Sequence, residues 1–399
     1  MRRTGDLKLI QELNRSIILD EIRHHGPTSR TDISKKHQLS PTTVSSAVHE
    51  LIQEGLVGES GVGYSSGGRK PRLVQFLPDQ QCIIGVSLKK SSIRITEMNL
   101  EATVKREISE PIRCIGQPII ERLIALLTNF LSQTSCVENC AGIAVIVQGV
   151  VDADEGIIRL NSKLNLVNVP IKKMLEERFR MPVFVDNDTN AFILAEKNFN
   201  SLDSYKNMVY VTVGDGVGAG IIVNGDIYRG RSGGSGEFGH TSIDLHGDSC
   251  ECGSRGCLEN YVSWPVIHTR IFSSLSRGTS SKMLDMANGD VTKISLVHYR
   301  QALRENDPLA VSINDEVAQY LSVGLVNLVH LFNPEVVILG GELLIENASL
   351  FDQVATHLET QTLRTLADGM DVRLTTLGKE FEMLGAASVL LQEKFRFTL

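Results

Sequence analysis

The sequence predicts an α/β protein in which an N-terminal winged helix-turn-helix is followed by a body of two α/β lobes. Three observations predict this fold class: helical spacing and then a hairpin in the first eighty residues, strands that alternate with helices after them, and a length of 399 residues, too great for one ordinary domain. We place the N-terminal module at 1–80, the first lobe at 81–187 with a C-terminal helix at 380–399 rejoining it, and the second lobe at 188–379.

The first eighty residues have the pattern of a helix-turn-helix. Apolar residues recur at helical spacing until Gly26-Pro27 ends a first helix, and a second short helix follows over 30–37. Ser40 is a good N-cap and Pro41 suits the first helical position, so a third helix begins there. Its buried stripe is predicted to be Val44, Ala47, Val48, Leu51 and Ile52. Its outward face is small and polar: Thr42, Thr43, Ser45, Ser46 and His49.

A basic hairpin follows this third helix. A strand that starts near Gly55 and another over 73–76 flank a loop rich in Gly and Ser, whose tip carries Arg69, Lys70 and Arg72. A polar helix face beside a basic wing is the arrangement that enters a major groove while the wing contacts phosphates or the minor groove. The module therefore predicts DNA binding, with a three-helix protein-interaction module as the alternative. Because one copy would make only about three to five phosphate contacts, we expect a dimer on palindromic operator DNA with two half-sites.

Beyond Pro78-Asp79-Gln80, strand and helix patterns alternate. Strands are expected at 83–88, 93–96, 142–147, 183–185, 208–213 and 336–339. Helices are expected at 118–131, 171–179, 189–199 and 321–332. Two similar halves of this kind predict ligand binding in the crevice between the lobes.

The glycine string at 214–220 fits a dinucleotide fingerprint only superficially. It is followed by an apolar run, Asn224-Gly225 and further apolar residues, which is the pattern of a β-hairpin with an Asn-Gly turn. We therefore expect a glycine turn between strands that approaches a ligand closely, and not a phosphate-binding helix start.

Three cysteines within eight residues, Cys250, Cys252 and Cys257, are the strongest chemical signal. Their spacing predicts a structural zinc site, with a reduced thiol cluster without metal as the alternative. A fourth ligand is needed, and His240 and His246 are both near enough along the chain. Four protein ligands leave the ion no open position, so a hydrolytic role is not expected.

Carboxylates and amides follow a strand end and flank the cysteines: Asn187, Asp188, Glu237 and Glu259. An ionised carboxylate accepts hydrogen bonds from vicinal hydroxyls, which is how proteins bind sugars. Any one of these residues alone would be a solvated surface group. Together they predict a pocket for a sugar or another polyol.

Composition and charge limit the class of protein. With 42% apolar and 22% charged residues the chain is globular. The net charge of −7 argues against a general nucleic-acid binder, yet residues 1–80 carry 11 Lys or Arg against 9 Asp or Glu, and the remainder 29 against 38. No membrane span and no secretory signal are expected. An odd number of cysteines, seven, favours a reduced cytoplasmic protein over a disulfide framework.

These motifs resemble the ROK family (repressors, open reading frames and sugar kinases). The resemblance is most specific at 236–240, Gly-Glu-Phe-Gly-His, and at 250–259, from the first clustered cysteine to Glu259. The stretch at 185–191 and the glycine hairpin add to it, and residues 66–71 look like those of the family's sugar repressors. It implies an actin-like, ribonuclease-H-like (ROK kinase-like) body that forms a homodimer or homotetramer.

The resemblance also implies roles for individual residues. The zinc ligands would be His240, Cys250, Cys252 and Cys257. The sugar pocket would be lined by Asn187, Asp188, Glu237, His240 and Glu259. His240 would bind zinc with one ring nitrogen and contact the sugar with the other. In the family's kinases the residue at Asp188 is the general base.

One stretch departs from the family's kinases. They carry Asp-x-Gly-Gly-Thr after the first strand, where glycine backbone cradles phosphate and the Asp helps to hold magnesium. Here the stretch is Ser87-Leu88-Lys89-Lys90-Ser91, and Asp215 stands where the kinases usually have Thr. Without this cradle, phosphoryl transfer loses most of its positioning and electrostatic stabilisation. We expect no enzyme activity and no catalytic residue, with Asp188 accepting a hydrogen bond from a sugar hydroxyl.

The sequence therefore predicts a transcriptional repressor of sugar-metabolism genes whose operator affinity is controlled by a sugar. One alternative is an ATP-dependent hexose kinase with an appended DNA-binding module. Another is a sensor whose effector is a protein, with a phosphotransferase-system protein as the candidate partner. The second lobe is expected to hold the zinc loop, the sugar site and the oligomerisation surface.

Overall fold

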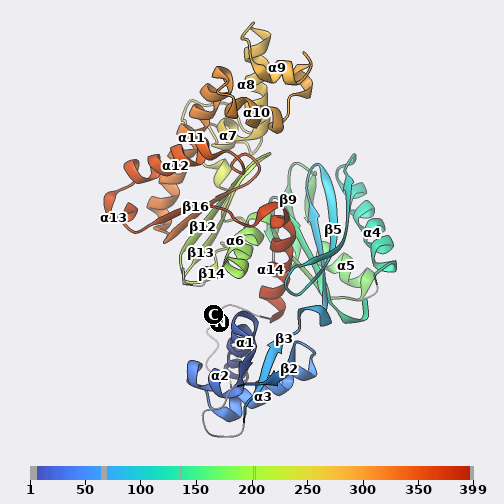
Figure 1. The fold of residues 1–399 in the computed structure, drawn as a ribbon. Helices are drawn as coiled ribbons and strands as arrows, with labels where there is room; N and C mark the ends of the chain where they lie inside the picture. Colours follow the sequence, from blue (N-terminus) through green and yellow to red (C-terminus); the bar gives the residue numbers. More distant parts are fainter. Residues whose placement is uncertain (1–6, 64–69, 135–136, 201, 203, 396–399) are drawn as a thin grey trace. The chain divides into compact units, whose positions relative to one another are not determined.

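A computed structural model describes residues 7–63, 70–134, 137–200, 202 and 204–395. The chain forms two compact units (Figure 1): the first contains the residues up to Leu194 and those from Glu382 onward, and the second contains residues 195–381. The predicted fold class is confirmed, because an N-terminal winged-helix module is followed by α/β structure in both units. Among the described helices, none is both long enough and apolar enough to cross a bilayer.

The N-terminal module consists of three helices and a three-stranded sheet. The helices are α1 (Leu7–His25), α2 (Arg30–His37) and α3 (Pro41–Gln53), and the sheet has the order β1 (Thr28–Ser29), β3 (Arg72–Phe76), β2 (Val57–Val62). Helix α3 begins where the sequence predicts, because the Ser40 hydroxyl accepts a hydrogen bond from the Thr43 backbone N–H at 3.0 Å and Pro41 has no N–H to satisfy. The two-residue β1, absent from the sequence analysis, closes the sheet against β3.

Apolar packing and one buried carboxylate hold the three helices together. The buried stripe of α3 is Val44, Ala47, Val48 and Leu51. Ile52, predicted to complete the stripe, is only half-buried. Glu21 on α1 is buried and contacts Lys36 Nζ at 2.8 Å and His37 Nε2 at 3.0 Å, both on α2. Burial alone would raise the pKa of Glu21, but hydrogen bonds from Lys36 and His37 outweigh burial and hold the pKa below its usual value.

A five-stranded sheet, ordered β11-β7-β4-β5-β6, forms most of the remaining first unit. Its strands are β4 (Cys82–Leu88), β5 (Ser92–Asn99), β6 (Val104–Pro111), β7 (Cys140–Val147) and β11 (Val183–Asn187). Helices α4 (Gln117–Ser132) and α5 (Ile171–Phe179) share an apolar core with this sheet. Helix α14 (Phe381–Phe395) lies so close to β4 that a Cβ on Gly85 would be 3.3 Å from the Met383 sulfur. Helix α6 (Asp188–Phe199) starts directly after β11.

A small antiparallel sheet was missed by the sequence analysis. Strands β8 (Val150–Asp152), β9 (Ile157–Asn161) and β10 (Leu166–Val169) are three to five residues long, and β6 alternates half-buried with exposed residues. Short or half-exposed strands carry little hydrophobic signal, which explains why only the buried strands were predicted.

The second unit has a sheet ordered β14-β13-β12-β15-β16 and most of the helices. The strands are β12 (Met208–Val213), β13 (Val217–Val223), β14 (Asp226–Ile227), β15 (Val336–Gly340) and β16 (Asp371–Leu374). The predicted hairpins are confirmed: β12 and β13 are antiparallel, and Asn224 and Gly225 turn the chain with φ of 54° and 91°. This excludes a phosphate-binding helix after the glycine string.

The helices of the second unit are more numerous than the sequence predicted. They are α7 (Glu259–Val262), α8 (Trp264–Ser276), α9 (Lys282–Met286), α10 (Leu296–Arg304), α11 (Pro308–Phe332), α12 (Ala348–Gln361) and α13 (Arg364–Ala367). Helix α11 begins well before the predicted residue 321, because the Asp307 side chain caps it by accepting a hydrogen bond from the Ala310 N–H at 3.0 Å. Helices α8 to α12 share one apolar core with β12, β13 and β15.

Candidate functional site

The outer face of α3 presents the small polar residues that the sequence assigned to DNA. Thr42, Ser45, Ser46 and His49 are exposed, and Thr43 is half-buried beside the Ser40 cap. The His49 and Gln53 side chains lie 3.1 Å apart on the same face. The face therefore offers small hydrogen-bonding side chains that can contact base edges.

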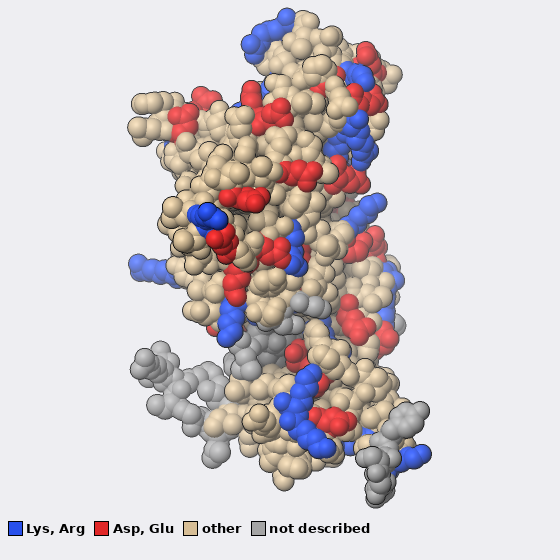
Figure 2. Space-filling view, turned by 60° about the vertical axis from the view of Figure 1, so that its left-hand side comes forward, with Lys and Arg blue, Asp and Glu red and all other residues tan. Residues whose placement is uncertain are grey.

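The wing residues differ in how they are held. Lys70 is exposed, whereas Arg72 lies within β3 and not at the hairpin tip, and its guanidinium donates to Glu59 at 2.6 Å. Glu59 also contacts Arg30 at 3.6 Å. Arg69 lies outside the described residues. In Figure 2 the N-terminal module, at the bottom of the view, accordingly shows Lys and Arg side chains with carboxylates beside them.

One loop of the second unit brings together His240, Cys250, Cys252 and Cys257, whose ligand atoms all lie within 4.8 Å of one another. The His240 Nδ1 is 3.5 Å from the Cys250 sulfur, and the Cys252 and Cys257 sulfurs are 3.6 Å apart. Zinc–sulfur bonds of about 2.3 Å at tetrahedral angles place two sulfurs about 3.8 Å apart, so these separations fit one tetrahedral ion. His246 is not in this cluster, which decides between the two histidines considered above.

The electrostatics of the thiols also suit a metal. Burial, together with the neighbouring Cys250 and Cys252 thiols, raises the pKa of Cys257 to about 12. A backbone hydrogen bond from Ser254 lowers the pKa of Cys252. A buried thiol of this kind loses its proton only to a cation that replaces it. The four side chains would therefore hold a zinc ion in a closed site, to which zinc would contribute structure and not reaction chemistry.

The cysteines outside the loop depart in one respect from the fully reduced chain that the sequence predicts. Cys114 and Cys140 are free, as are the three cysteines of the loop, but Cys82 is disulfide-bonded.

Three of the predicted sugar-binding residues belong to the second unit. Glu237 precedes the short turn at Phe238–His240, of which His240 is the last residue, and Glu259 starts α7 directly after the cysteine loop. Glu259 is fixed in orientation, because its Oε2 accepts a hydrogen bond from the Val217 backbone N–H at 2.9 Å. His240 turns Nδ1 to the thiols, so its other ring nitrogen is the one that faces away from them.

The other two, Asn187 and Asp188, lie in the first unit at the junction of β11 and α6. The Asn187 side chain is engaged within its own unit: its Nδ2 donates to the Gly149 carbonyl at 2.8 Å, and its Oδ1 accepts from the Thr189 N–H at 2.8 Å. The Asp188 Oδ1 accepts from the Thr189 N–H at 2.9 Å. Asn187 therefore shapes this corner of the fold, a role that the sequence analysis did not assign to it.

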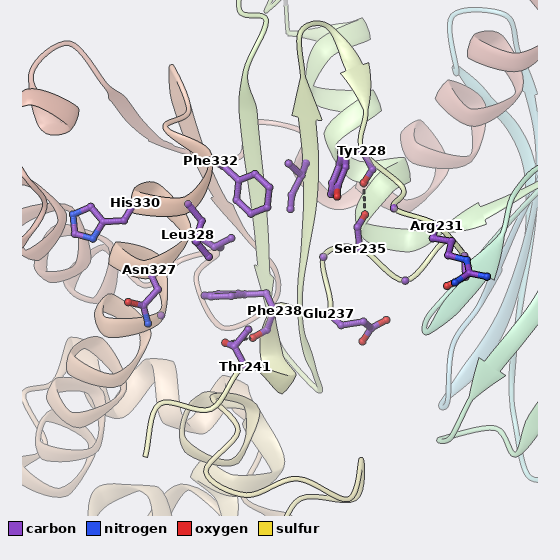
Figure 3. Close-up of a pocket in the computed structure, with 17 residues that line it drawn as sticks. Tyr228, Arg231, Ser235, Glu237, Phe238, Thr241, Asn327, Leu328, His330 and Phe332 are labelled. Carbon is purple, nitrogen blue, oxygen red and sulfur yellow. Dashed lines mark hydrogen bonds between the residues drawn. The ribbon is translucent and has the colours of Figure 1, made fainter. Parts of the chain in front are cut away.

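A cavity of about 700 Å³ in the second unit was not predicted. It lies between the C-terminal part of α11 and the loop at 228–238. In Figure 3 the rings of Tyr228, Phe238 and Phe332 lie around it with Leu328 beside them, while Arg231 and Glu237 point to the other side. Its rim is apolar and exposed, since Leu331 is 77% and Tyr228 47% exposed. In the sequence, only the continuous helical pattern of α11 could have indicated the apolar surface around this cavity.

The stretch that departs from the family's kinases is a tight hairpin between β4 and β5. Ser87 is buried in β4, and the Lys89 N–H donates to the Ser92 carbonyl at 3.0 Å. The Lys89 ammonium forms an ion pair with Glu382 of α14, and Lys90 is exposed. The lysine at the first glycine position is thus held by a carboxylate of its own unit.

These parts define the class of protein: a MarR-type winged-helix module joined to a ROK body. The sequence model of the ROK family matches residues 84–393, and that of the MarR family matches residues 13–58. The chain belongs to the ROK family.

Full-length relatives and a solved structure share this two-part organisation. The xylose repressor of Caldicellulosiruptor bescii is 31% identical over 398 residues, covering 98% of this chain and 99% of that protein. The DNA-binding transcriptional dual regulator NagC of Escherichia coli K12 is 30% identical over 370 residues, covering 92% and 90%. A crystal structure of a ROK family transcriptional regulator, described as a homolog of the E. coli MLC protein, has a TM-score of 0.85 and 28% identity, covering 97% of each chain.

Proposed function

We propose that this protein is a cytoplasmic transcriptional repressor of sugar-metabolism genes that binds operator DNA and releases it when a sugar binds to the body. One observation carries the proposal: the winged-helix module and the ROK body occur in one chain, and relatives named as a xylose repressor and as a DNA-binding transcriptional dual regulator match it over 90% or more of their length. The test is a gel-shift titration with operator DNA selected from genomic fragments, repeated with a panel of sugars. DNA binding that no sugar weakens would contradict the sugar response.

For the DNA interface we propose the outer face of α3, with Thr42, Thr43, Ser45, Ser46 and His49 contacting base edges. Arg69, Lys70 and Arg72 would contact phosphates. The exposure of the α3 face and its lack of fixed charge support this assignment. As in the sequence analysis, residues 1–80 are taken as the DNA-binding module, 81–187 with 380–399 as the first lobe, and 188–379 as the second.

For the body we propose a structural zinc ion held by His240, Cys250, Cys252 and Cys257, and a sugar bound by Asn187, Asp188, Glu237, His240 and Glu259. The fit of the four ligand atoms to a tetrahedron supports the metal. The fixed Glu259 carboxylate and the division of His240 between two ring nitrogens support the sugar contacts. Asn187 has one amide N–H left for a sugar after its bonds to Gly149 and Thr189 are counted.

We propose a population shift as the mechanism. Sugar would favour the state of the body in which the two winged helices of a dimer no longer match the half-site spacing. A sugar that binds one state tenfold better supplies only about 1.4 kcal/mol, so a useful switch needs a preference of about a hundredfold or more. Comparing sugar affinity with and without bound operator measures this preference directly.

The competing function is an ATP-dependent sugar kinase with an appended DNA-binding module. Lys89 and Lys90 at the positions of the kinases' phosphate-binding glycines, and Ser87 in place of their Asp, argue against it. The ion pair of Lys89 with Glu382 supports the same conclusion, because it holds a side chain where glycine backbone would have to meet phosphate. A coupled assay with ATP, magnesium and the sugar panel decides, and turnover above background would overturn the repressor-only proposal.

For the partner subunit we propose that the apolar rim of the cavity in the second unit forms the oligomerisation surface. Leu331 is 77% exposed, and Leu363, whose N–H bonds the His330 ring at 3.1 Å, is 63% exposed. Such clustering of large apolar side chains at a surface is typical of a protein interface. Leu331→Asp should lower the mass observed by light scattering, and an unchanged mass would exclude this face. A homodimer would serve a palindromic operator. A homotetramer would appear in the same measurement, and a phosphotransferase-system partner would appear there after that protein is added.

A further inference from the structure

Residues 241–249 lie between the first two proposed zinc ligands, and hydrogen bonds to the Asp244 side chain hold the middle of this segment in place. Asp244 uses both oxygens: Oδ1 accepts a hydrogen bond from the His246 backbone N–H at 2.9 Å, and Oδ2 accepts one from the Tyr261 hydroxyl at 3.0 Å. The Asp244 carbonyl accepts a third bond, from the Gly247 N–H at 3.2 Å. This one residue therefore joins the ligand loop to α7.

Two glycines show how tightly the loop packs against Asp244 and Tyr261. A Cβ on Gly256 would lie 1.8 Å from the Asp244 carbonyl oxygen, and Gly256 has a φ of 62°. A Cβ on Gly247 would lie 2.2 Å from the Tyr261 hydroxyl oxygen. Gly256 directly precedes the ligand Cys257, so a shift of Asp244 or Tyr261 reaches the metal site through backbone that has no spare room.

The hydrogen-bonded pair of Asp244 and Tyr261 is in turn supported by α11, the long helix of the second unit. The Tyr261 ring lies 4.5 Å from the Tyr320 ring of α11, measured between centroids, and the Arg270 guanidinium is 5.9 Å from the centre of the Tyr320 ring. Arg270 also forms an ion pair with Glu316 of α11 at 2.9 Å. Packing against Tyr320 therefore fixes the position of the Tyr261 ring, and with it the position of the hydroxyl that bonds Asp244.

We propose that Tyr261 and Asp244 are positioning residues of the metal centre: their hydrogen bond fixes the loop in the geometry that brings the four ligand atoms together. Neither side chain ligates the ion in this assignment. The inference rests on the proposed zinc site, but it concerns residues outside the ligand set. It implies that removing the Tyr261 hydroxyl, which bonds Asp244, loosens a metal ion that this hydroxyl does not touch.

The test compares zinc release from the full-length, zinc-loaded chain and its Tyr261→Phe, Asp244→Ala and double variants. Release is followed by transfer to a chromophoric chelator in excess. Partners that hold ligands in place change metal affinity by about ten- to hundredfold, so each single variant should release zinc at least about tenfold faster. The double variant should release it no faster than the faster single variant, because both changes break the same bond.

Tyr320→Phe is the matched control. It also removes a tyrosine hydroxyl, but from the ring that packs against Tyr261 and not from Tyr261 itself, and its release rate should stay within about twofold of the wild type. The visible spectrum of the cobalt-substituted protein adds a readout that general loss of stability does not alter: Tyr261→Phe should change the bands of the tetrahedral ion, and Tyr320→Phe should not.

Two outcomes overturn the inference in distinguishable ways. Wild-type protein that holds zinc, with unchanged release and cobalt spectrum in Tyr261→Phe, overturns the positioning role alone. Wild-type protein that binds neither zinc nor cobalt overturns the metal site itself. Should Tyr261→Phe not fold, Asp244→Ala carries the same comparison.

Discussion

The metal loop and the proposed sugar residues are built in opposite ways. All four ligand atoms of the loop come from residues 240–257, and backbone hydrogen bonds such as those of Cys250 with Ser254 and of Ile243 with Gly256 fold the segment on itself. The sugar residues are instead divided, with Asn187 and Asp188 in the first unit and Glu237, His240 and Glu259 in the second. The loop can therefore form within one unit, whereas the proposed sugar residues are contributed by two units.

This difference in construction suits the two groups of residues to different roles. A site made within one short segment is as stable as that segment, which suits a structural ion. The proposed sugar set draws residues from both units, and under the proposed mechanism a sugar acts by binding one state of the body better than another. His240 belongs to both sets, and it is the point at which metal and sugar would meet.

The largest expected effect is on the metal loop. Cys252→Ser should abolish stoichiometric zinc binding and cost several kcal/mol of stability, because the binding free energy of a structural ion is part of the folding free energy. Metal analysis and thermal unfolding check both. Cys114→Ser, which removes a free thiol outside the loop, is the control and should leave zinc content unchanged. A zinc content of one ion per chain in Cys252→Ser would contradict the ligand assignment.

The next effect separates two neighbouring residues of the sugar set. Asp188→Ala should weaken sugar binding about ten- to hundredfold, because a charged hydrogen-bond acceptor is lost, and leave operator binding intact. Calorimetry and gel shifts measure the two. Asn187→Ala should also lower stability by about 1–3 kcal/mol, because the Gly149 carbonyl loses its partner and the Thr189 N–H keeps only its bond to Asp188. Equal stability of the two variants would show that the bonds of Asn187 contribute nothing to the fold.

The sequence predicted what depends on local pattern. The helix cap at Ser40 and the turn at Asn224-Gly225 both lie where expected, because a cap or a turn depends on only a few adjacent residues. Spacing narrowed the fourth zinc ligand to two histidines, and of these His240 lies in the cluster that could hold a metal ion. Pairing across distance was not predictable: the ion pair of Lys89 with Glu382 joins residues almost 300 positions apart, and the hydrogen bond of Tyr261 with Asp244 leaves no motif in the sequence.

A smaller effect is the pH dependence of zinc binding. Because the pKa of Cys257 is raised to about 12, this thiol keeps its proton at neutral pH until zinc displaces it. The apparent zinc affinity should therefore fall as the pH falls, by about tenfold per pH unit for each proton released. Calorimetry in buffers of different ionisation enthalpy counts the protons. A zinc affinity that stays constant over about two pH units around neutral pH would mean that the thiols are already ionised.

The smallest expected effect concerns the wing, where the structure distinguishes two cations that the sequence treated alike. Lys70→Ala should weaken binding to every DNA sequence alike and make the log–log salt dependence about one unit shallower, as Arg69→Ala should. Arg72→Ala should change the slope less, because the Arg72 guanidinium already donates to Glu59 at 2.6 Å and would have to leave that carboxylate to reach a phosphate. Glu59→Gln tests this explanation: it should steepen the salt dependence only while Arg72 is present. Equal slopes for Lys70→Ala and Arg72→Ala would show that DNA displaces Glu59 at no measurable cost.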